Sequence, residues 1–321
     1  MAKKIKAVVL AAGKSLRMKS GKTKILHTIL GKEIINYLLD SLVACGIAEQ
    51  DIVVVVGDNY AEIAGTVTRK VVYAVQTEQL GTAHALLAAR EQISGHGGEL
   101  LVVVGDNPYI TADDLQKMIA GHRQGRAQCT FLTAVFPGSP PPYGRVLRDE
   151  QGAVQGIVEE KDASPTQRQI REVNAAIYLF DNQIVFPLLA RIGNHNAKKE
   201  YYLTDIIAIL RQENLVVQGV QADDCAVAIG INDRRDLQAA HDKFNLRNQQ
   251  RLLENGVTIL QPDTVTIEQD VEIGPDTALF PCTYLAAGTR IGKNCLIGPF
   301  VYLKNTRIQD GEKIVFEKRG T

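Results

Sequence analysis

The chain has 321 residues, more than one hydrophobic core usually serves, so we expect a large domain with a smaller appendage. Lysine plus arginine and aspartate plus glutamate number 36 each. The net charge is therefore close to zero, and the protein has no overall positive electrostatic field to attract a nucleic-acid backbone or an anionic membrane. We expect neither as a partner. The five cysteines include no CxxC pair and their number is odd, which argues against a zinc site or a disulfide framework and favours a reducing, cytoplasmic location.

Short apolar runs alternate with helical patterns over residues 5–136, which is typical of βα units and a mostly parallel sheet. We expect strands at residues 5–10, 52–56, 71–75, 100–104, 129–136 and 173–180. Apolar residues at helical spacing predict helices around residues 34–43 and 83–93. Ligands collect at the carboxyl ends of the strands in an open α/β sheet, so the residues that follow these runs are candidates for a site.

The last quarter of the chain has a different pattern. A charged, glutamine-rich segment at residues 233–256 predicts a linker helix. Beyond it, aliphatic residues recur every six positions, which is typical of a parallel β-helix. They are Ile267, Ile273, Leu279, Leu285, Ile291, Ile297 and Leu303. We expect about two coils that end near Ile308, followed by a polar tail. So few coils favour a homo-oligomer, for which a trimer through the β-helix is one form.

The first loop, residues 10–27, follows a strand and carries Gly13 and five basic residues before any acid. Such a loop can aim backbone N–H groups and cations at a triphosphate, although a basic loop alone is more typical of a solvated turn. Gly21-Lys22-Thr23 looks like the end of a P-loop, but Leu16 stands where such a loop has its first glycine. Asp106 directly follows an apolar run, where a carboxylate could meet Mg²⁺ and substrate phosphates or simply begin a turn.

Eight motifs follow one another along the chain. They are LAAGKSLRMK (10–19), VQTEQLGTAHA (75–85), VVGDNPYI (103–110), YGRV (143–146), GIVEEKDA (156–163), EVNAAIYLF (172–180), EYYLTDII (200–207) and IGIND (229–233). Their order resembles that of the bacterial N-acetylglucosamine-1-phosphate uridyltransferase family, here without the acetyltransferase part. The resemblance implies a Rossmann-like mixed-sheet α/β nucleotidyltransferase domain at 1–232, the linker helix at 233–256, and a short left-handed parallel β-helix of hexapeptide repeats with a tail at 257–321.

The resemblance also implies an activity and a set of site residues. The chain would join UTP to N-acetylglucosamine 1-phosphate with Mg²⁺ as cofactor and release pyrophosphate. The catalytic residues that contact the triphosphate would be Arg17 and Lys24. The nucleotide-binding residues would be Leu10, Ala11, Ala12, Gly13, Lys24, Gln76, Gly81 and Thr82, with Gln76 at the uracil edge. The sugar-binding residues would be Gly144, Glu159, Asn174, Glu200, Tyr202 and Thr204, and the metal ligands would be Asp106 and Asn232.

The implied site is chemically coherent, because transfer between phosphates needs positioning and charge neutralisation more than a nucleophilic side chain. Taken singly, Gln76 could be a solvated strand end, Glu159 part of a charged run, and Tyr202 a core aromatic residue. We expect His84 to fill a helix start, since this chemistry needs no general base of its type. The other histidines show no ligand spacing, so we expect no zinc.

Five residues depart from the family pattern. Ser15-Leu16 replace Gly-Thr, Thr23 replaces a proline, and Ala175-Ala176 replace Thr-Gly in the sugar motif. If Ser15 needs a positive φ, it costs about 1 kcal/mol or more. Thr23 leaves the loop less rigid than proline would. The methyl group of Ala176 could crowd the sugar, so another sugar 1-phosphate stays open as the substrate.

Two further expectations concern the whole protein. Members of the family with a second activity have many more coils, which bind acetyl-CoA and acetylate glucosamine 1-phosphate, so we expect no acetyltransferase activity here. A pyrophosphorylase-like domain with hexapeptide repeats also occurs in non-catalytic assembly or regulatory subunits. Retention of Arg17, Lys24 and Asp106 favours the enzyme over that alternative.

Overall fold

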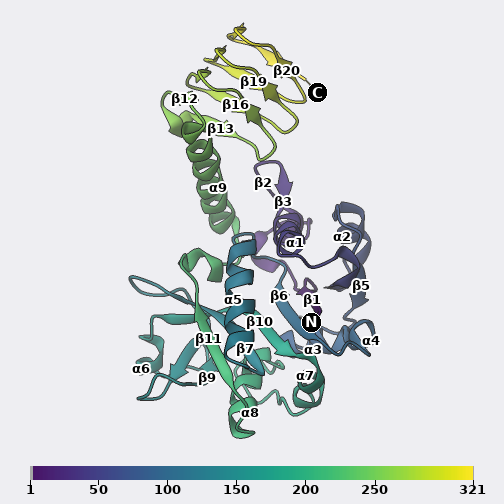
Figure 1. Ribbon diagram of the computed structural model, residues 1–321. Helices are drawn as coiled ribbons and strands as arrows, with labels where there is room; N and C mark the ends of the chain where they lie inside the picture. The colour runs from purple at the N-terminus through teal and green to yellow at the C-terminus, as the bar shows by residue number, and fades with distance from the viewer. Residues whose placement is uncertain (1–2, 321) are drawn as a thin grey trace. The chain divides into compact units, whose positions relative to one another are not determined.

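The computed structural model describes residues 3–320 and divides them into two compact units (Figure 1). The first unit runs to Leu26 and resumes over Ile34–Ile231. The second unit comprises His27–Glu33 and the chain from Asn232 onward. No helix within residues 3–320 has both the length and the apolar composition needed to cross a membrane.

The first unit is a mixed sheet with helices on both faces. Its strands are β1 (Ile5–Leu10), β4 (Ile52–Val56), β5 (Val72–Val75), β6 (Glu99–Val104), β7 (Cys129–Val135), β8 (Arg145–Arg148), β9 (Val154–Val158), β10 (Glu172–Asp181) and β11 (Val217–Gln221). Its helices are α1 (Ile34–Ala44), α2 (Tyr60–Thr66), α3 (Thr82–Ala88), α4 (Arg90–Ile93), α5 (Ala112–Gln124), α6 (Pro165–Arg168), α7 (Asn182–Leu189) and α8 (Ile206–Gln212). The strands and helices expected from the apolar patterns all form.

The strand order of the sheet is β11-β7-β10-β6-β1-β4-β5, with β8 and β9 attached beside β10. Strand β1 pairs in parallel with β4 and β6, and β4 pairs in parallel with β5. Strand β10 runs antiparallel to β6 and β7. The predicted mixed α/β sheet is therefore confirmed. The parallel strands bring the segments that follow β1, β5 and β6 to one edge of the sheet.

Alternation along the strands sends apolar side chains to two cores. On one face, Ala7 and Val9 of β1 pack with the buried leucines and isoleucines of α1 and α5. On the other face, Val8 packs with buried residues of α3, α7 and α8. Each fully buried leucine or isoleucine contributes roughly 1.5–3 kcal/mol. These two cores make the sheet a rigid support for the loops at its edge.

The second unit contains the expected linker helix, α9 (Arg234–Glu254). Its N-cap is Asp233, whose side chain accepts hydrogen bonds from the backbone N–H groups of Arg235 and Asp236. Strands β2 (Thr28–Ile29) and β3 (Lys32–Glu33) form a hairpin in the same unit. Nε2 of His241 on α9 lies 3.0 Å from the carbonyl oxygen of Thr28. The hairpin thus packs on the linker helix, although the two are far apart in sequence.

The remaining strands stack as a coil of three parallel sheets. They are β12 (Thr258–Ile259), β13 (Val265–Ile267), β14 (Glu272–Ile273), β15 (Ala278–Leu279), β16 (Thr283–Leu285), β17 (Arg290–Ile291), β18 (Leu296–Ile297), β19 (Val301–Leu303), β20 (Arg307–Ile308), β21 (Lys313–Ile314) and β22 (Lys318–Arg319). Val265 pairs with Thr283, and Thr283 with Val301, so the register advances by eighteen residues for each coil. The predicted parallel β-helix is confirmed.

The expected end of the repeats near Ile308 is wrong, because β21 and β22 continue two of the sheets. Ile297 pairs with Ile314, seventeen residues on rather than eighteen. One residue is missing from the six-residue period between Leu303 and Ile308, so the later strands fell out of the expected series. Outward-facing Lys313 is exposed and made the segment look like a polar tail.

Candidate functional site

A cavity of about 570 Å³ opens at the carboxyl ends of β1, β5 and β6, within the first unit. It is lined by Leu10, Ala11, Ala12, Gly13, Lys14, Ser15, Leu16, Thr23, Lys24, Ile25, Gln76, Gln79, Gly81, Thr82, Ala85, Val104, Asp106 and Glu200. Every residue expected to bind the nucleotide is in this lining, together with one of the two expected metal ligands. Arg17 is not. It lies in the 3-10 turn Leu16–Met18 and is exposed to solvent.

The loop after β1 does not carry the strain considered from the sequence. Ser15 has φ −82°, so no positive φ is needed where the family has glycine. Its Oγ accepts a hydrogen bond of 2.7 Å from the backbone N–H of Lys24. Leu16 is 80% exposed and therefore does not fill the cavity. Ser15 thus holds the backbone of Lys24 at the cavity wall.

Thr23 is fixed by hydrogen bonds, although replacing the family's proline by threonine predicts a less rigid loop. Its Oγ donates to Oε2 of Glu62 over 2.6 Å, and its backbone N–H donates to Oε1 of the same carboxylate over 3.4 Å. Glu62 belongs to α2, so the loop is tied to a helix outside the cavity. A proline has no N–H and could not make the second of these bonds.

The Lys24 ammonium and the Asp106 carboxylate form an ion pair in the cavity, with side-chain exposures of 18% and 21%. The backbone N–H of Ile231 donates to the carbonyl oxygen of Asp106 over 2.9 Å. A Cβ added at Gly230 would lie 2.9 Å from Oδ1 of Asp106, so the chain passes close to this carboxylate. The absence of a side chain at Gly230 keeps room around both oxygens.

The donor set fits a hard divalent ion that takes most of its ligands from phosphates and water. Residues 3–320 contain no cluster of three or more His, Cys, Asp or Glu side chains that could hold a metal by themselves. Mg²⁺ commonly takes only one or two protein oxygens when phosphates are bound, and the Asp106 carboxylate can supply them. Asn232 is the first residue of the second unit, where its backbone N–H donates to Oδ2 of Asp236 over 2.8 Å. Its pairing with Asp106 stays a prediction.

Gln76 is 4% exposed and lies in the cavity wall directly after β5. Its Nε2 lies 3.0 Å from Nδ1 of His84 and 3.4 Å from the carbonyl oxygen of Gly81. His84 does lie in the first turn of α3, as expected, but it also contacts a site residue, which sequence reasoning missed. The spacing of eight residues between Gln76 and His84 across a strand end and a loop gives no signal of this contact.

Gly81 needs to be glycine for two reasons. Its φ is 121°, and a Cβ there would lie 2.5 Å from the carbonyl oxygen of Tyr201. The backbone N–H of Ala83 donates to that same oxygen over 3.0 Å. The loop before α3 is therefore joined to the segment that carries the expected sugar residues.

Four of the expected sugar-binding residues form a connected group beside β10. The backbone N–H of Asn174 donates to the carbonyl oxygen of Gly144 over 2.9 Å. Oγ1 of Thr204 donates to Oε1 of Glu159 over 3.1 Å. A Cβ at Gly144 would lie 2.8 Å from the Ile157 side chain, so only glycine fits there. Burial raises the pKa of Glu159, and the Thr204 hydrogen bond partly opposes that shift.

The hydroxyl group of Tyr202 is buried. The residue is 6% exposed, and within residues 3–320 no hydrogen bond reaches its buried hydroxyl oxygen. Burial, followed by the charges of Asp162 and Glu159, raises the pKa of Tyr202 to about 12, so the hydroxyl is a neutral donor at pH 7. A buried donor without an acceptor is costly to keep, and a ligand oxygen could satisfy it. Glu200, the remaining expected sugar residue, lies in the cavity wall.

Ala176 has φ 56°, a left-handed conformation that alanine adopts at a cost of about 1 kcal/mol. It lies where the pairing of β10 with β7 shifts register between Asn174 and Tyr178. Its backbone N–H donates to Oδ1 of Asn174 over 3.1 Å, and the residue packs against the core beneath α3 and α7. The glycine of the family pattern therefore corresponds to a real backbone requirement here.

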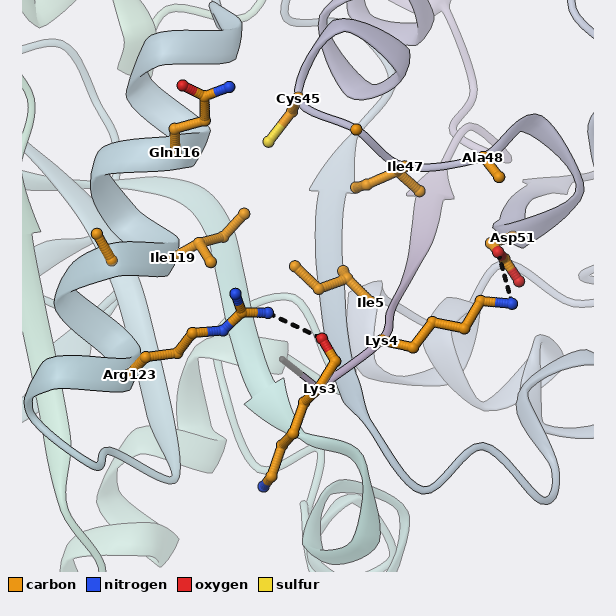
Figure 2. A pocket seen from close by; sticks show the side chains of 12 residues that line it. Lys3, Lys4, Ile5, Cys45, Ile47, Ala48, Asp51, Gln116, Ile119 and Arg123 are labelled. Atoms are coloured by element: carbon orange, nitrogen blue, oxygen red, sulfur yellow. Dashed lines mark hydrogen bonds and ion pairs between the residues drawn. The ribbon is translucent and has the colours of Figure 1, made fainter. Parts of the chain in front are cut away.

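A second cavity, of about 530 Å³, lies at the opposite end of β1 (Figure 2). Its charged side chains are already engaged. Lys4 pairs with Asp51 at 2.8 Å, and Arg123 donates to the carbonyl oxygen of Lys3 over 2.9 Å. Figure 2 draws both contacts as dashed lines. No residue expected to bind substrate lies there, so the cavity at the carboxyl ends is the candidate active site.

Comparison with known proteins finds relatives over nearly the whole chain. Residues 6–225 match the nucleotidyl transferase family. The chain is 41% identical over 304 residues to the bifunctional protein GlmU of an Exiguobacterium strain, covering 95% of this chain and 67% of that protein. It is 40% identical over 313 residues to the bifunctional protein GlmU of Brevibacillus brevis, covering 98% and 67%. The chain thus spans about two thirds of the length of these relatives. The matches confirm the resemblance indicated by the eight motifs.

Proposed function

Because the chain belongs to the nucleotidyl transferase family, we propose that it is a Mg²⁺-dependent uridylyltransferase that converts UTP and N-acetylglucosamine 1-phosphate to UDP-N-acetylglucosamine and pyrophosphate. One observation carries the proposal. The residues expected to bind the nucleotide line a single cavity, together with the Lys24–Asp106 ion pair. The word bifunctional in the relatives' names describes those proteins, and only the nucleotidyl transfer is proposed for this chain.

In the proposed reaction, a phosphate oxygen of the sugar 1-phosphate attacks the α-phosphorus of UTP. The bond from the α-phosphorus to the oxygen that bridges to the β-phosphate breaks, and pyrophosphate leaves with the electron pair. The attacking phosphate is already ionised at neutral pH, so no protein group has to remove a proton. Catalysis then depends on alignment and charge neutralisation, which suits a cavity lined by lysine side chains and the Asp106 carboxylate.

Lys24 supplies the positive charge in this mechanism. Its backbone is held by Ser15, and its ammonium is held by Asp106 until substrate arrives. The triphosphate would draw the ammonium away from the carboxylate. Mg²⁺ bound by Asp106 and Asn232 would add positive charge shared by the substrate phosphates. Arg17, which is exposed beside the cavity lining, would reach the triphosphate by a change of side-chain conformation.

The group around β10 would bind the sugar. Gly144 leaves space beside Glu159, whose carboxylate is oriented by Thr204. The hydroxyl of Tyr202, which has no hydrogen-bond partner within residues 3–320, could donate to a sugar or acetyl oxygen. Glu200 lies in the cavity wall together with the residues expected to bind the nucleotide. The choice of N-acetylglucosamine rests on the resemblance of these motifs to the family.

Pyrophosphate release tests the proposal. The protein is supplied with UTP, Mg²⁺ and one of a panel of sugar 1-phosphates, with a chelator as the metal control. We expect release with N-acetylglucosamine 1-phosphate well above that with glucose 1-phosphate or galactose 1-phosphate. Release with glucose 1-phosphate alone would replace the sugar in the proposal. No release with any sugar would favour the non-catalytic assembly subunit.

A further inference from the structure

We propose that His84 is a positioning residue that turns the side-chain oxygen of Gln76 toward the cavity and thereby makes the site select uracil over cytosine. The inference deepens the proposed function and rests on it for the nucleotide that enters the cavity. His84 would not touch the substrate itself. It would act through Gln76, which lines the cavity.

The side-chain amide of Gln76 has one terminal atom that faces two neighbours. That atom lies 3.4 Å from the carbonyl oxygen of Gly81 and 3.0 Å from Nδ1 of His84. A backbone carbonyl oxygen can only accept a hydrogen bond, so the atom that faces it has to be the nitrogen, Nε2. Nδ1 of His84 then has to be an acceptor, which places the imidazole proton on its other nitrogen.

This arrangement uses both N–H groups of the Gln76 amide. Its side-chain oxygen, Oε1, is the group left for a ligand. Gln76 is only 4% exposed, so water cannot easily hydrogen-bond to an amide group that lacks its protein partner. A wrongly oriented amide would therefore be costly. A flipped amide would place its oxygen against the Gly81 carbonyl oxygen, and that repulsion disfavours the alternative. While its proton is on Nε2, His84 presents a lone pair that also repels the oxygen of a flipped amide, and without it only the long bond to Gly81 would resist the flip.

An oxygen at this place discriminates between the two pyrimidines. Uracil has an N–H group at ring position 3, flanked by two carbonyl oxygens. Cytosine has a bare ring nitrogen there, which is an acceptor. Oε1 of Gln76 can accept from uracil, but it would meet the lone pair of cytosine. A base that leaves buried polar groups of the site unpaired binds much more weakly. This discrimination is larger than an apolar pocket can achieve.

The readout is nucleotide affinity without the sugar substrate. Dissociation constants for UTP and CTP are measured by titration calorimetry with Mg²⁺ present, for the wild-type chain and each variant. We expect the wild-type chain to bind UTP at least about tenfold more tightly than CTP. Equal affinities would overturn the inference even if turnover of UTP were found. Failure of the proposed function would show separately, as no pyrophosphate with any sugar 1-phosphate.

Variants at position 84 test the role of the ring nitrogen. His84→Phe keeps an aromatic ring but removes the acceptor, and we expect the preference for UTP to fall by roughly 5- to 10-fold. His84→Asn offers an amide oxygen near the position of Nδ1 and should keep most of the preference. His84→Ala also lacks the acceptor and replaces the phenylalanine variant if that variant does not fold.

A double variant separates positioning from a structural role. If His84 acts only through Gln76, then Gln76→Ala should abolish the preference, and Gln76→Ala with His84→Phe should lose nothing more. Steady-state kinetics should show a larger rise in KM for UTP than fall in kcat for His84→Phe. Equal weakening of UTP and CTP, or additive losses in the double variant, would overturn the inference.

Discussion

Lys24 and Asp106 form an ion pair in which the ammonium from the loop after β1 meets the carboxylate at the end of β6. Asp106→Asn keeps the shape of the side chain and removes its charge. We expect kcat to fall at least about 100-fold, because charge neutralisation at the phosphates is the main catalytic effect. The melting temperature should change by only a few degrees, since both side chains lie at a cavity edge. Pyrophosphate release and thermal unfolding measure the two effects.

Asp223→Asn is the matched control for that change. Asp223 also pairs with a lysine, Lys117, at 2.7 Å, but its side chain is 87% exposed. The control should leave both kcat and the melting temperature nearly unchanged. Should Asp106→Asn unfold the protein as well as inactivate it, Asp106 would be a structural residue and the proposed metal ligand would be lost.

The tie between Thr23 and Glu62 predicts a loss and a rescue. Glu62→Ala removes the two hydrogen bonds between Glu62 and Thr23 and leaves the long one of 3.4 Å from Nδ2 of Asn59 to Oγ1 of Thr23, so the loop next to Lys24 becomes less ordered. We expect KM for UTP to rise roughly 3- to 10-fold with a smaller change in kcat.

Adding Thr23→Pro to Glu62→Ala should restore part of the affinity. Proline fixes φ near −65° in place of the lost bonds, and the N–H that it removes no longer has its partner. Steady-state kinetics on the single and double variants measure this. A double variant that is worse than Glu62→Ala alone would show that Glu62 does not act through the rigidity of Thr23.

Tyr202→Phe separates binding from stability. The hydroxyl group of Tyr202 makes no hydrogen bond within residues 3–320, so its removal should leave the free energy of unfolding unchanged or raise it by up to about 1 kcal/mol. KM for the sugar 1-phosphate should rise roughly 5- to 10-fold if that hydroxyl donates to the sugar. Urea unfolding and kinetics with varied sugar 1-phosphate measure the two effects. Lower stability with an unchanged KM would show a purely structural tyrosine.

The same residue predicts a dependence of stability on alkaline pH. Burial raises the pKa of Tyr202 from 10.0 to about 12, so the folded protein resists ionisation that the unfolded chain undergoes. The stability linked to this group is fully present below pH 10 and is lost as the pH rises toward about 12. Between neutral pH and pH 11.5, the free energy of unfolding should fall by up to about 2 kcal/mol less in Tyr202→Phe than in the wild-type chain. An identical alkaline loss in both would contradict this.

Gly81→Ala should damage both the fold and the site. At φ 121°, with a new Cβ 2.5 Å from the Tyr201 carbonyl oxygen, we expect a loss of about 2 kcal/mol or more in the free energy of unfolding. Gly152→Ala is the control, because Gly152 has φ 82° but nothing within 4 Å of the new Cβ. That control should cost only about 1 kcal/mol and leave UTP affinity unchanged. Equal costs would mean that the close approach of Tyr201 contributes nothing.

Several site features could not be predicted from sequence because they depend on contacts between distant segments. The hydrogen bonds from Glu62 to Thr23 come from α2, and His84 is a side-chain partner of Gln76. From the sequence, Thr23 predicted a less rigid loop, and His84 predicted only the start of a helix. Both expectations considered one segment at a time, whereas side-chain partners are set by how segments pack.

The sequence by itself determined the alternating strands and helices of the first unit, the linker helix and the repeating coil. Those features follow from local periodicity, because buried faces of helices, strands and β-helices each require apolar residues at a fixed spacing. Only the tertiary structure decided that β10 enters the sheet antiparallel between β6 and β7, and that the coil continues past Ile308. It also decided that Ala176 takes φ 56° and that Tyr202 buries a hydroxyl group to which no other group in residues 3–320 hydrogen-bonds. Strand order, backbone strain and hydrogen-bond partners arise from contacts between residues far apart in the chain, and no local pattern encodes them.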